Sequence, residues 1–554
     1  MSAGENLKPS EGMTRRAAAT WMVVISAVGA IFLLANLGDA VLWVDEADTA
    51  CIARNILKYG LPVCWDHGFL IEAPVTKYAP GWIWNQHPWL MHYLIAASFA
   101  VSGRISALTA RLPFAILGIA TLPLTYLLAR RAGASRRGAL LSAALLLLNV
   151  QFLLFARQAR YFALLAFTTT LLFLGFLELE RRRGLILFIV GAVALFHSNY
   201  MTFFPIGAAV WAWAIFVDRD ARKIKRLAVA TGLILILTIP WMFKFDVFAK
   251  KELVRQFSVG GFLIEVKEYA AKFNRTVFPL ALLVILGALA SAGYRKGLRF
   301  QGLILAALGA SIIFVVPASV VRSLRYLVGF FPALCVAAAL IFEDLWNWRR
   351  PVAVLAAALF LVTTIWSEAA ILPSVLLRRI VGYQRDYENV HVKRDMANRF
   401  LRVEWADFYR ELRSGFHQDP LYNFIGLIKN EGRSGDLVVT SHYSTQIDFY
   451  TRFPTMAIFN WQDRGFEKPR GYLSSPEGFE RIWYMRRPTF ALERFEQWVN
   501  EGVKAGRLVI HPVDFDEPDI AVGNDPDLDT RLDTRESIDR LPRTKVYLIK
   551  RVPR

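Results

Sequence analysis

The sequence predicts a mainly α-helical membrane protein: a polytopic transmembrane bundle with a juxtamembrane loop on its outer face and a soluble α/β domain at the C-terminus. Three observations lead to this fold class. Hydrophobic residues make up 55% of the 554 residues, and the mean hydropathy is +0.35, which is more apolar surface than one soluble core needs. Long apolar runs recur before Pro373. Strand-like runs follow it.

The apolar runs are long enough to cross a bilayer, whose hydrocarbon core needs roughly 20 residues of helix. The first run, 17–38, follows Lys8, Arg15 and Arg16 and has no small-residue cleavage site after it. We therefore expect a retained transmembrane helix and not a signal peptide. About eleven spans are expected, at 17–38, 112–128, 139–155, 162–179, 185–196, 202–217, 227–245, 277–292, 303–319, 326–342 and 352–371.

The charges between these runs indicate how the chain crosses the membrane. Segment 88–103 is apolar but short, and we expect it to lie in the interface, because the arginine-rich connections then all face the cytoplasm. Residues 1–16 are then cytoplasmic, 17–372 form the transmembrane domain, and both the first loop (39–111) and the C-terminal domain (373–554) lie outside. These connections account for the formal net charge of +19, so no nucleic-acid partner is expected.

The region from Pro373 onward predicts a small α/β domain. Short strand-like runs at 436–440, 508–510 and 545–549 alternate with amphipathic stretches such as 493–505. Cys51 and Cys64 share the outer loop, where two alternatives stay open: the two thiols pair in a disulfide, or both remain unpaired. Cys335 lies inside a span, and we expect it to be inert.

An acidic cluster of Asp45, Glu46 and Asp48 follows the first span at the outer membrane surface. The run is typical of a helix start. In one interpretation, Asp45 is only an N-cap and Asp48 is a first-turn acid that the helix dipole favours. In the other, the cluster is functional, because carboxylates at a membrane surface are candidates for chemistry.

Cationic and aromatic side chains are expected on the same side of the membrane as this cluster. Arg157 and Arg160 are three residues apart, so they share one helix face if a helix has already begun there. Snorkelling toward lipid headgroups explains either arginine alone, whereas two guanidinium groups beside a carboxylate suggest a phosphate ligand. The aromatic belt explains the outer tyrosines but not the cations. The other candidates in these connections are Lys77, His87, Tyr161, His197, Tyr200 and Arg325.

Five short motifs follow one another along the chain: Asp45-Glu46-Ala47, His87-Pro88, Ala110-Arg111-Leu112-Pro113, the run 156–165 and His197-Ser198-Asn199-Tyr200. In this order they resemble the C-type integral-membrane glycosyltransferases, especially bacterial relatives of the dolichyl-phosphate-mannose protein mannosyltransferases and of the lipid A aminoarabinose transferase. The resemblance covers about residues 20–200 and is looser to 342. Two departures stand out. The family commonly has a second proline and a leucine after His-Pro, where this chain has Trp89 and Leu90. This chain also has Gln158 where many family members have glutamate.

The resemblance implies transfer of a sugar from a polyprenyl-phosphate carrier to an acceptor at the outer face of a bacterial plasma membrane. A lipid phosphate is already a good leaving group, so one carboxylate and basic residues would suffice, unlike the two carboxylic acids of a glycosidase. We expect Asp45 to accept the acceptor's proton during inverting attack, with Glu46 as a backup base. The expected phosphate ligands are Arg157, Arg160, Lys77 and Arg325, and the expected sugar or acceptor pocket consists of His87, Tyr161, His197 and Tyr200.

This chemistry requires no cofactor, although Asp45, Glu46 and Asp48 would be oxygen ligands for a divalent cation if another segment completed the shell. The expected partners are the polyprenyl-phosphate donor, membrane lipid and a glycan, lipid or protein acceptor. One rival function is an oligosaccharide transferase that uses a diphosphate-linked donor and a metal. Another is a transporter or flippase of lipid-linked sugars, which would place ionisable residues near the midplane. The expected spans are nearly free of acids, which favours surface chemistry.

Overall fold

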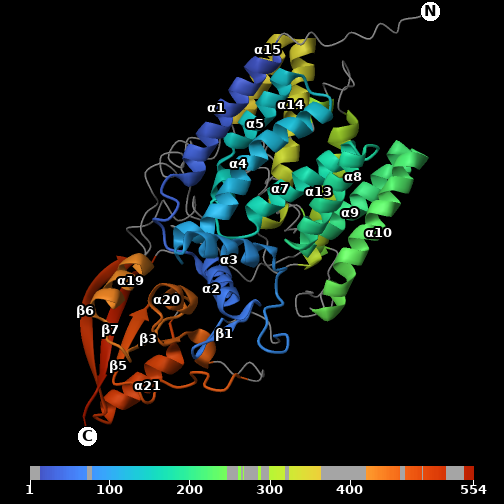
Figure 1. The fold of residues 1–554 in the computed structure, drawn as a ribbon. Coiled ribbons are helices and arrows are strands. Elements are labelled where there is room, and N and C mark those ends of the chain that lie inside the picture. The colour runs from blue at the N-terminus through green and yellow to red at the C-terminus, as the bar shows by residue number, and fades with distance from the viewer. Residues whose placement is uncertain are drawn as a thin grey trace, which may run out of the picture. The chain divides into compact units, whose positions relative to one another are not determined.

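We describe the protein from a computed structural model, which defines residues 13–71, 78–245, 260–263, 266, 285–288, 298–318, 324–362, 420–461, 468–488, 491–519 and 542–553 (Figure 1). The chain divides into two compact units. The helical unit comprises Met1–Ala35, Phe114–Arg157 and Tyr161–Arg413. The mixed unit comprises Asn36–Pro113, Gln158–Arg160 and Ser414–Arg554, so it joins most of the first loop to most of the C-terminal region.

The helical unit is built from apolar helices. They are α1 (Arg15–Leu34), most of α4 (Ala107–Arg131), α5 (Arg136–Leu147), α6 (Val150–Ala156), α7 (Phe162–Leu177), α8 (Arg182–Phe196), α9 (Tyr200–Trp213), α10 (Ala221–Lys244), α13 (Leu298–Ala318), α14 (Phe331–Trp348) and α15 (Arg350–Val362). A π-helical turn, η1 (Ala214–Asp218), follows α9, and a 3-10 turn, η3 (Leu324–Phe330), precedes α14. The first turn of α4 belongs to the mixed unit.

Glycines set the close packing of α7 against α8. A Cβ atom on Gly191 would lie 2.7 Å from the backbone nitrogen of Leu172, and one on Gly184 would overlap the backbone of Glu178. Small residues let helix backbones approach each other in this way in membrane proteins, where van der Waals packing drives association.

Five described helices are long and apolar enough to cross a membrane: Arg15–Leu34, Ala107–Arg131, Tyr200–Asp218, Ala221–Lys244 and Leu324–Trp348. The expected span 139–155 is broken into α5 and α6, which are bent by 66° relative to each other. Asn149 causes the break, because its side chain accepts a hydrogen bond of 2.7 Å from the backbone nitrogen of Phe152 and caps α6 as a new helix. Most of the expected span 277–292 lies outside the described residues.

In the mixed unit, the first loop folds into α2 (Val44–Tyr59), a small hairpin of β1 (Trp65–Asp66) and β2 (Phe69–Leu70), and α3 (Leu90–Ser102). α3 has 13 residues, which is shorter than a span. Cys51 and Cys64 are both buried free thiols, so the disulfide alternative is wrong for this structure. Burial raises the pKa of both thiols well above the usual value.

The C-terminal region of this unit contributes a five-stranded sheet in the order β4-β3-β5-β7-β6 (Figure 1). Its strands are β3 (Leu437–Val439), β4 (Thr455–Met456), β5 (Arg481–Arg486), β6 (Leu508–Pro518) and β7 (Arg543–Arg551). β3 pairs parallel with β4 and β5, whereas β7 pairs antiparallel with β5 and β6. The three expected strand runs and the expected helix are confirmed as β3, β6, β7 and α21 (Glu493–Lys504).

Alternating side chains place one hydrophobic core on each face of this sheet. On one face, Val438, Trp483 and Val546 pack with α19 (Pro420–Glu431), α20 (Ser444–Thr451) and Val41 of the first loop. On the other face, Leu437, Val439 and Ile482 pack with α21. The presence of Val41 in the first core explains why the first loop and the C-terminal region form one unit.

Candidate functional site

The expected helix start at the acidic cluster is confirmed, since α2 begins at Val44 and Trp43 is its N-cap residue. Asp45 lies in the first turn and is not the N-cap. The guanidinium of Arg160 lies beside it: Nη2 is 3.4 Å from Asp45 Oδ2, and Nη1 donates to the Asp45 carbonyl oxygen over 3.1 Å and to Thr49 Oγ1 over 2.8 Å. The Arg160 side chain is 3% exposed and the Asp45 side chain is 28% exposed.

Glu46, one residue on, is fully buried and paired with Arg111 at the start of α4. Arg111 donates from Nε to Glu46 Oε1 over 2.8 Å and from Nη2 to Oε2 over 2.7 Å. Two backbone N–H groups also bind this carboxylate: Ala159 N donates to Oε1 over 2.6 Å, and Trp43 N donates to Oε2 over 3.2 Å. Each oxygen therefore accepts two hydrogen bonds, the usual capacity of a carboxylate oxygen.

The guanidinium of Arg111 likewise has all its donors in hydrogen bonds. Besides the two bonds to Glu46, its guanidinium donates to the carbonyl oxygens of Leu37, Ala40 and Val41 over 3.0, 2.8 and 3.1 Å. These bonds use all five N–H groups of a guanidinium. The pair thus fixes the segment before α2, the start of α4 and Ala159. Because Arg160 follows Ala159 directly, Glu46 holds the backbone that brings Arg160 to Asp45. This geometry gives Glu46 a positioning role and leaves no lone pair for the expected backup base.

The condition under which Arg157 and Arg160 would share a helix face, that a helix has already begun there, is not met. Helix α6 ends at Ala156, with Arg157 as its C-cap residue, and α7 begins at Phe162. The two arginines lie in the connection and belong to different units. Within the helical unit, Arg157 Nη1 donates to the Phe32 carbonyl oxygen over 2.6 Å. A three-residue spacing places two residues on one face only within a helix, and here a non-helical connection contains both arginines.

The other predicted residues lie in both units, except Lys77, which falls outside the described residues. His87 lies in the mixed unit, where its ring stacks on Trp84 with centroids 5.8 Å apart. In the helical unit, Trp241 contacts both the ring of His197, at 5.3 Å between centroids, and the Tyr200 hydroxyl, to which its indole N–H donates. Two predicted residues pack against their chain neighbours: the ring of Tyr161 contacts Phe162, and the guanidinium of Arg325 lies 5.3 Å from the centroid of the Tyr326 ring.

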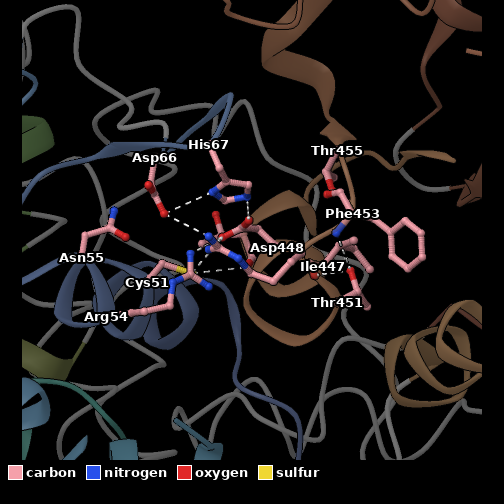
Figure 2. Close-up of polar contacts among 12 residues, drawn as sticks. Cys51, Arg54, Asn55, Asp66, His67, Ile447, Asp448, Thr451, Phe453 and Thr455 are labelled. Carbon is pink, nitrogen blue, oxygen red and sulfur yellow. Dashed lines mark hydrogen bonds and ion pairs between the residues drawn. The ribbon is translucent and has the colours of Figure 1, made fainter. Parts of the chain in front are cut away.

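A second polar cluster, which no sequence motif indicated, lies further along α2 and involves α20 (Figure 2). Its centre is Asp448, whose side chain is 0% exposed. Arg54 Nη2 donates to Asp448 Oδ2 over 2.6 Å, and His67 Nε2 lies 2.7 Å from Oδ1. Burial raises the pKa of Asp448, but the hydrogen bond from His67 and the charge of Arg54 outweigh burial, so its pKa lies below the ordinary value.

Asp66 on the hairpin is the second carboxylate of this cluster. Lys58 Nζ donates to its Oδ1 over 2.7 Å, Arg452 Nη2 donates to its Oδ2 over 3.0 Å, and His67 Nδ1 lies 3.2 Å from that oxygen. Burial raises the pKa of Asp66, but the hydrogen bond from Lys58 and then that from Arg452 outweigh it, so its pKa also lies below the ordinary value. The cluster ties α2 and the hairpin to α20 through charged groups.

Within the described ranges, no group of three or more His, Cys, Asp or Glu side chains has the arrangement of a metal site. Near Asp45, the adjacent carboxylate of Glu46 is taken up by Arg111, and Asp45 itself faces Arg160. The chemistry offered here is that of one partly exposed carboxylate beside one buried guanidinium.

Comparison with known proteins gives one family match and several structural matches. Residues 86–243 match the family model of dolichyl-phosphate-mannose-protein mannosyltransferase. ArnT from Cupriavidus metallidurans bound to undecaprenyl phosphate is similar over 96% of this chain and 98% of its own, with a TM-score of 0.57 and 15% sequence identity. Its apo state gives the same values. An oligosaccharyltransferase of Archaeoglobus fulgidus in complex with Zn and sulfate has a TM-score of 0.48 and 14% identity, covering 84% of this chain and 68% of its own. A search of the curated proteins finds no match.

The family match and the ArnT-like fold confirm what the ordered motifs predicted. The apolar helices add that this is an integral membrane protein. Residues 86–243 thus match the model of the dolichyl-phosphate-mannose-protein mannosyltransferase family, and the chain has a fold similar to that of ArnT.

Proposed function

We propose that the protein transfers a sugar from a polyprenyl-phosphate carrier to an acceptor hydroxyl at the outer face of a bacterial plasma membrane. The observation that carries this proposal is the Asp45–Arg160 pair, a partly exposed carboxylate beside a buried cation. A solved structure of the similar protein ArnT contains undecaprenyl phosphate, which supports the choice of carrier. In this proposal the N-terminus is cytoplasmic, and the first loop and C-terminal region are outside.

The proposed step is a single inverting displacement. The acceptor oxygen forms a bond to the anomeric carbon, and the bond between that carbon and the phosphate oxygen breaks. The electron pair of that bond leaves with the lipid phosphate, and Asp45 accepts the proton of the acceptor hydroxyl. A positioned base of this kind contributes roughly 10²- to 10⁴-fold to a rate.

Arg160 is the proposed electrostatic residue of this step. Its buried guanidinium stabilises negative charge more effectively than a solvated cation would, because water screens it less. Its bonds to Thr49 and to the Asp45 carbonyl hold it beside the base. Arg157, Lys77 and Arg325 stay predicted ligands of the phosphate. His87, Tyr161, His197 and Tyr200 stay predicted residues of the sugar or acceptor pocket.

Glu46 and Arg111 are proposed positioning residues for this pair. Neither has a group left to touch substrate, because their hydrogen bonds are used within the mixed unit. They act by holding Trp43 and Ala159 on the same carboxylate, which fixes the start of α2 and the residue before Arg160.

The test is transfer by the purified full chain in lipid nanodiscs, with polyprenyl-phosphate donors carrying a hexose or a pentose and a mass-spectrometric readout of the products. Wild-type protein should release the polyprenyl phosphate and add one sugar mass to an acceptor in an envelope-lipid or envelope-protein extract. Arg160→Lys, which keeps the charge but loses the planar fork, should reduce kcat by about 10- to 100-fold. Absence of transfer from every donor, with correctly folded protein, would overturn the proposal.

A further inference from the structure

Among the buried polar side-chain atoms that have no hydrogen-bond partner within the described residues, five belong to four side chains of the mixed unit that concern us here. These five atoms are the two ring nitrogens of His92, the indole nitrogens of Trp43 and Trp84, and Oε1 of Gln158. An unpaired polar atom in a protein interior is costly, roughly 1 to 3 kcal/mol for each group. Such groups therefore call for an explanation in a native protein.

Contacts or chain neighbours link these residues to Arg160 or to Glu46. The backbone N–H groups of Trp43 and Ala159 both donate to Glu46, and Gln158 precedes Ala159 in the chain. His92 lies on α3, close enough to Arg160 for the positive charge of the guanidinium to lower the pKa of His92. The ring of Trp84 lies edge-on to His92, with centroids 6.4 Å apart. His92 thus lies near Arg160, and Trp84 lies beside His92. Other buried polar atoms without a partner occur elsewhere in the described residues, such as those of Asn55, Ser311 and Thr544.

The imidazole of His92 is neutral at physiological pH. Burial, with the nearby charge of Arg160, lowers the pKa of His92 to about 3. A neutral imidazole has one N–H donor and one bare nitrogen acceptor. His92 therefore offers a matched donor and acceptor, and it cannot serve as an acid or base near neutral pH.

The mixture of donors and acceptors identifies the class of ligand. Indole N–H groups donate, Gln158 Oε1 accepts, and His92 does both. A phosphate presents acceptors only, so the bare nitrogen of His92 and the Gln158 oxygen would oppose it. A sugar hydroxyl donates and accepts, and the apolar face of a sugar ring packs against aromatic rings, which Trp43 and Trp84 supply.

We propose that His92, Trp84, Trp43 and Gln158 form a subsite that binds the hydroxyl groups of the sugar beside Asp45 and Arg160. This inference rests on the proposed sugar transfer and adds the residues that select the sugar. The polar atoms are closed to solvent in this structure, so neighbouring side chains must turn aside when the sugar binds. The subsite is a specificity element, separate from the base and from the phosphate contacts.

The experiment compares His92→Leu, His92→Asn and wild type for their kcat/KM with polyprenyl-phosphate donors that carry a hexose, a 6-deoxyhexose or a pentose. His92→Leu removes the polar atoms at similar volume, so its thermal midpoint should be unchanged or higher, while its preference among the three sugars should shrink about 10- to 100-fold. His92→Asn keeps a donor and an acceptor and should recover part of the preference. Phe99→Leu, a buried apolar change on the same helix, is the control; it should lower the thermal midpoint and keep the preference.

Two outcomes overturn the subsite. One is an unchanged sugar preference in His92→Leu, as expected if a buried water satisfies the imidazole. The other is loss of thermal stability in His92→Leu with kinetics that follow only the folded fraction, as expected for a structural histidine. Failure of the wild type to use any donor is a different result, because it overturns the sugar transfer itself. The wild-type rates therefore separate the two proposals.

Discussion

Helix α2 carries two very different carboxylate environments. In its first turn, Asp45 is partly exposed and faces the cation of Arg160. Further along the helix, Cys51 and Arg54 reach the fully buried Asp448, which is also contacted by His67 and Arg452. A carboxylate with several fixed partners and no exposure holds parts of a fold together. A partly exposed carboxylate beside a buried cation can meet a substrate. The difference assigns chemistry to one end of α2 and anchoring to the other.

The largest effect should come from Asp45→Asn, which keeps the shape of the side chain and removes the base. We expect kcat to fall by roughly 10²- to 10⁴-fold. The thermal midpoint should hardly change, because the side chain is partly exposed. Asp39→Asn, an exposed carboxylate just before α2, is the matched control and should retain full transfer. Near-normal turnover of Asp45→Asn would assign the base to another residue.

The next effect concerns the buried pair that positions this site. Arg111→Met leaves the fully buried Glu46 without its guanidinium, and breaking a buried ion pair in this way costs roughly 3 to 5 kcal/mol. The free energy of unfolding should fall by that amount in denaturant or thermal titrations. Glu46→Gln with Arg111→Met removes both charges and should recover part of the loss. If the single and double variants are equally stable, the pair does not have the role proposed for it.

The Glu46–Arg111 pair shows how much of the site could be predicted from the sequence, because both residues lie in the ordered motifs. Asp45-Glu46 and Ala110-Arg111 are local signals in an ordered series, so the helix start at the acidic cluster and the importance of the region could be predicted. That Glu46 binds Arg111, and so cannot act as a base, depends on contacts across 65 residues of sequence. The Arg54–Asp448 pair spans 394 residues. Residue spacing carries no information about such pairs, and it failed for Arg157 and Arg160, where the chain leaves the helix.

The anchoring cluster should show itself in the pH dependence of stability. Asp448 and Asp66 have pKa values below their ordinary value of 3.8 in the folded protein. A lowered folded-state pKa stabilises the protein above the unfolded-state pKa, and this contribution is lost as the pH falls through the folded-state value. The thermal midpoint of wild type should therefore decline as the pH drops below about 4.

Asp448→Asn tests the assignment of that decline. The variant loses a charge-assisted bond and leaves Arg54 unpaired, so it should be roughly 1.5 to 3 kcal/mol less stable at pH 7. It should also lose less stability on acidification than wild type does. Asp514→Asn, which changes an exposed carboxylate on β6, is the control and should keep the wild-type pH profile. An Asp448→Asn profile parallel to that of wild type would place the acid sensitivity elsewhere.

The smallest effect is expected from removal of divalent cations. A cation at the acidic cluster would need several oxygen ligands, yet the four hydrogen bonds to Glu46 occupy its oxygens. The charge of Arg160 beside Asp45 would also repel a cation. Transfer in excess EDTA should therefore equal transfer in Mg²⁺ or Mn²⁺. A loss in EDTA that added metal restores would favour the rival with a diphosphate-linked donor. It would also require Asp45 to turn from Arg160 toward a metal, which would erase the contrast between the two ends of α2.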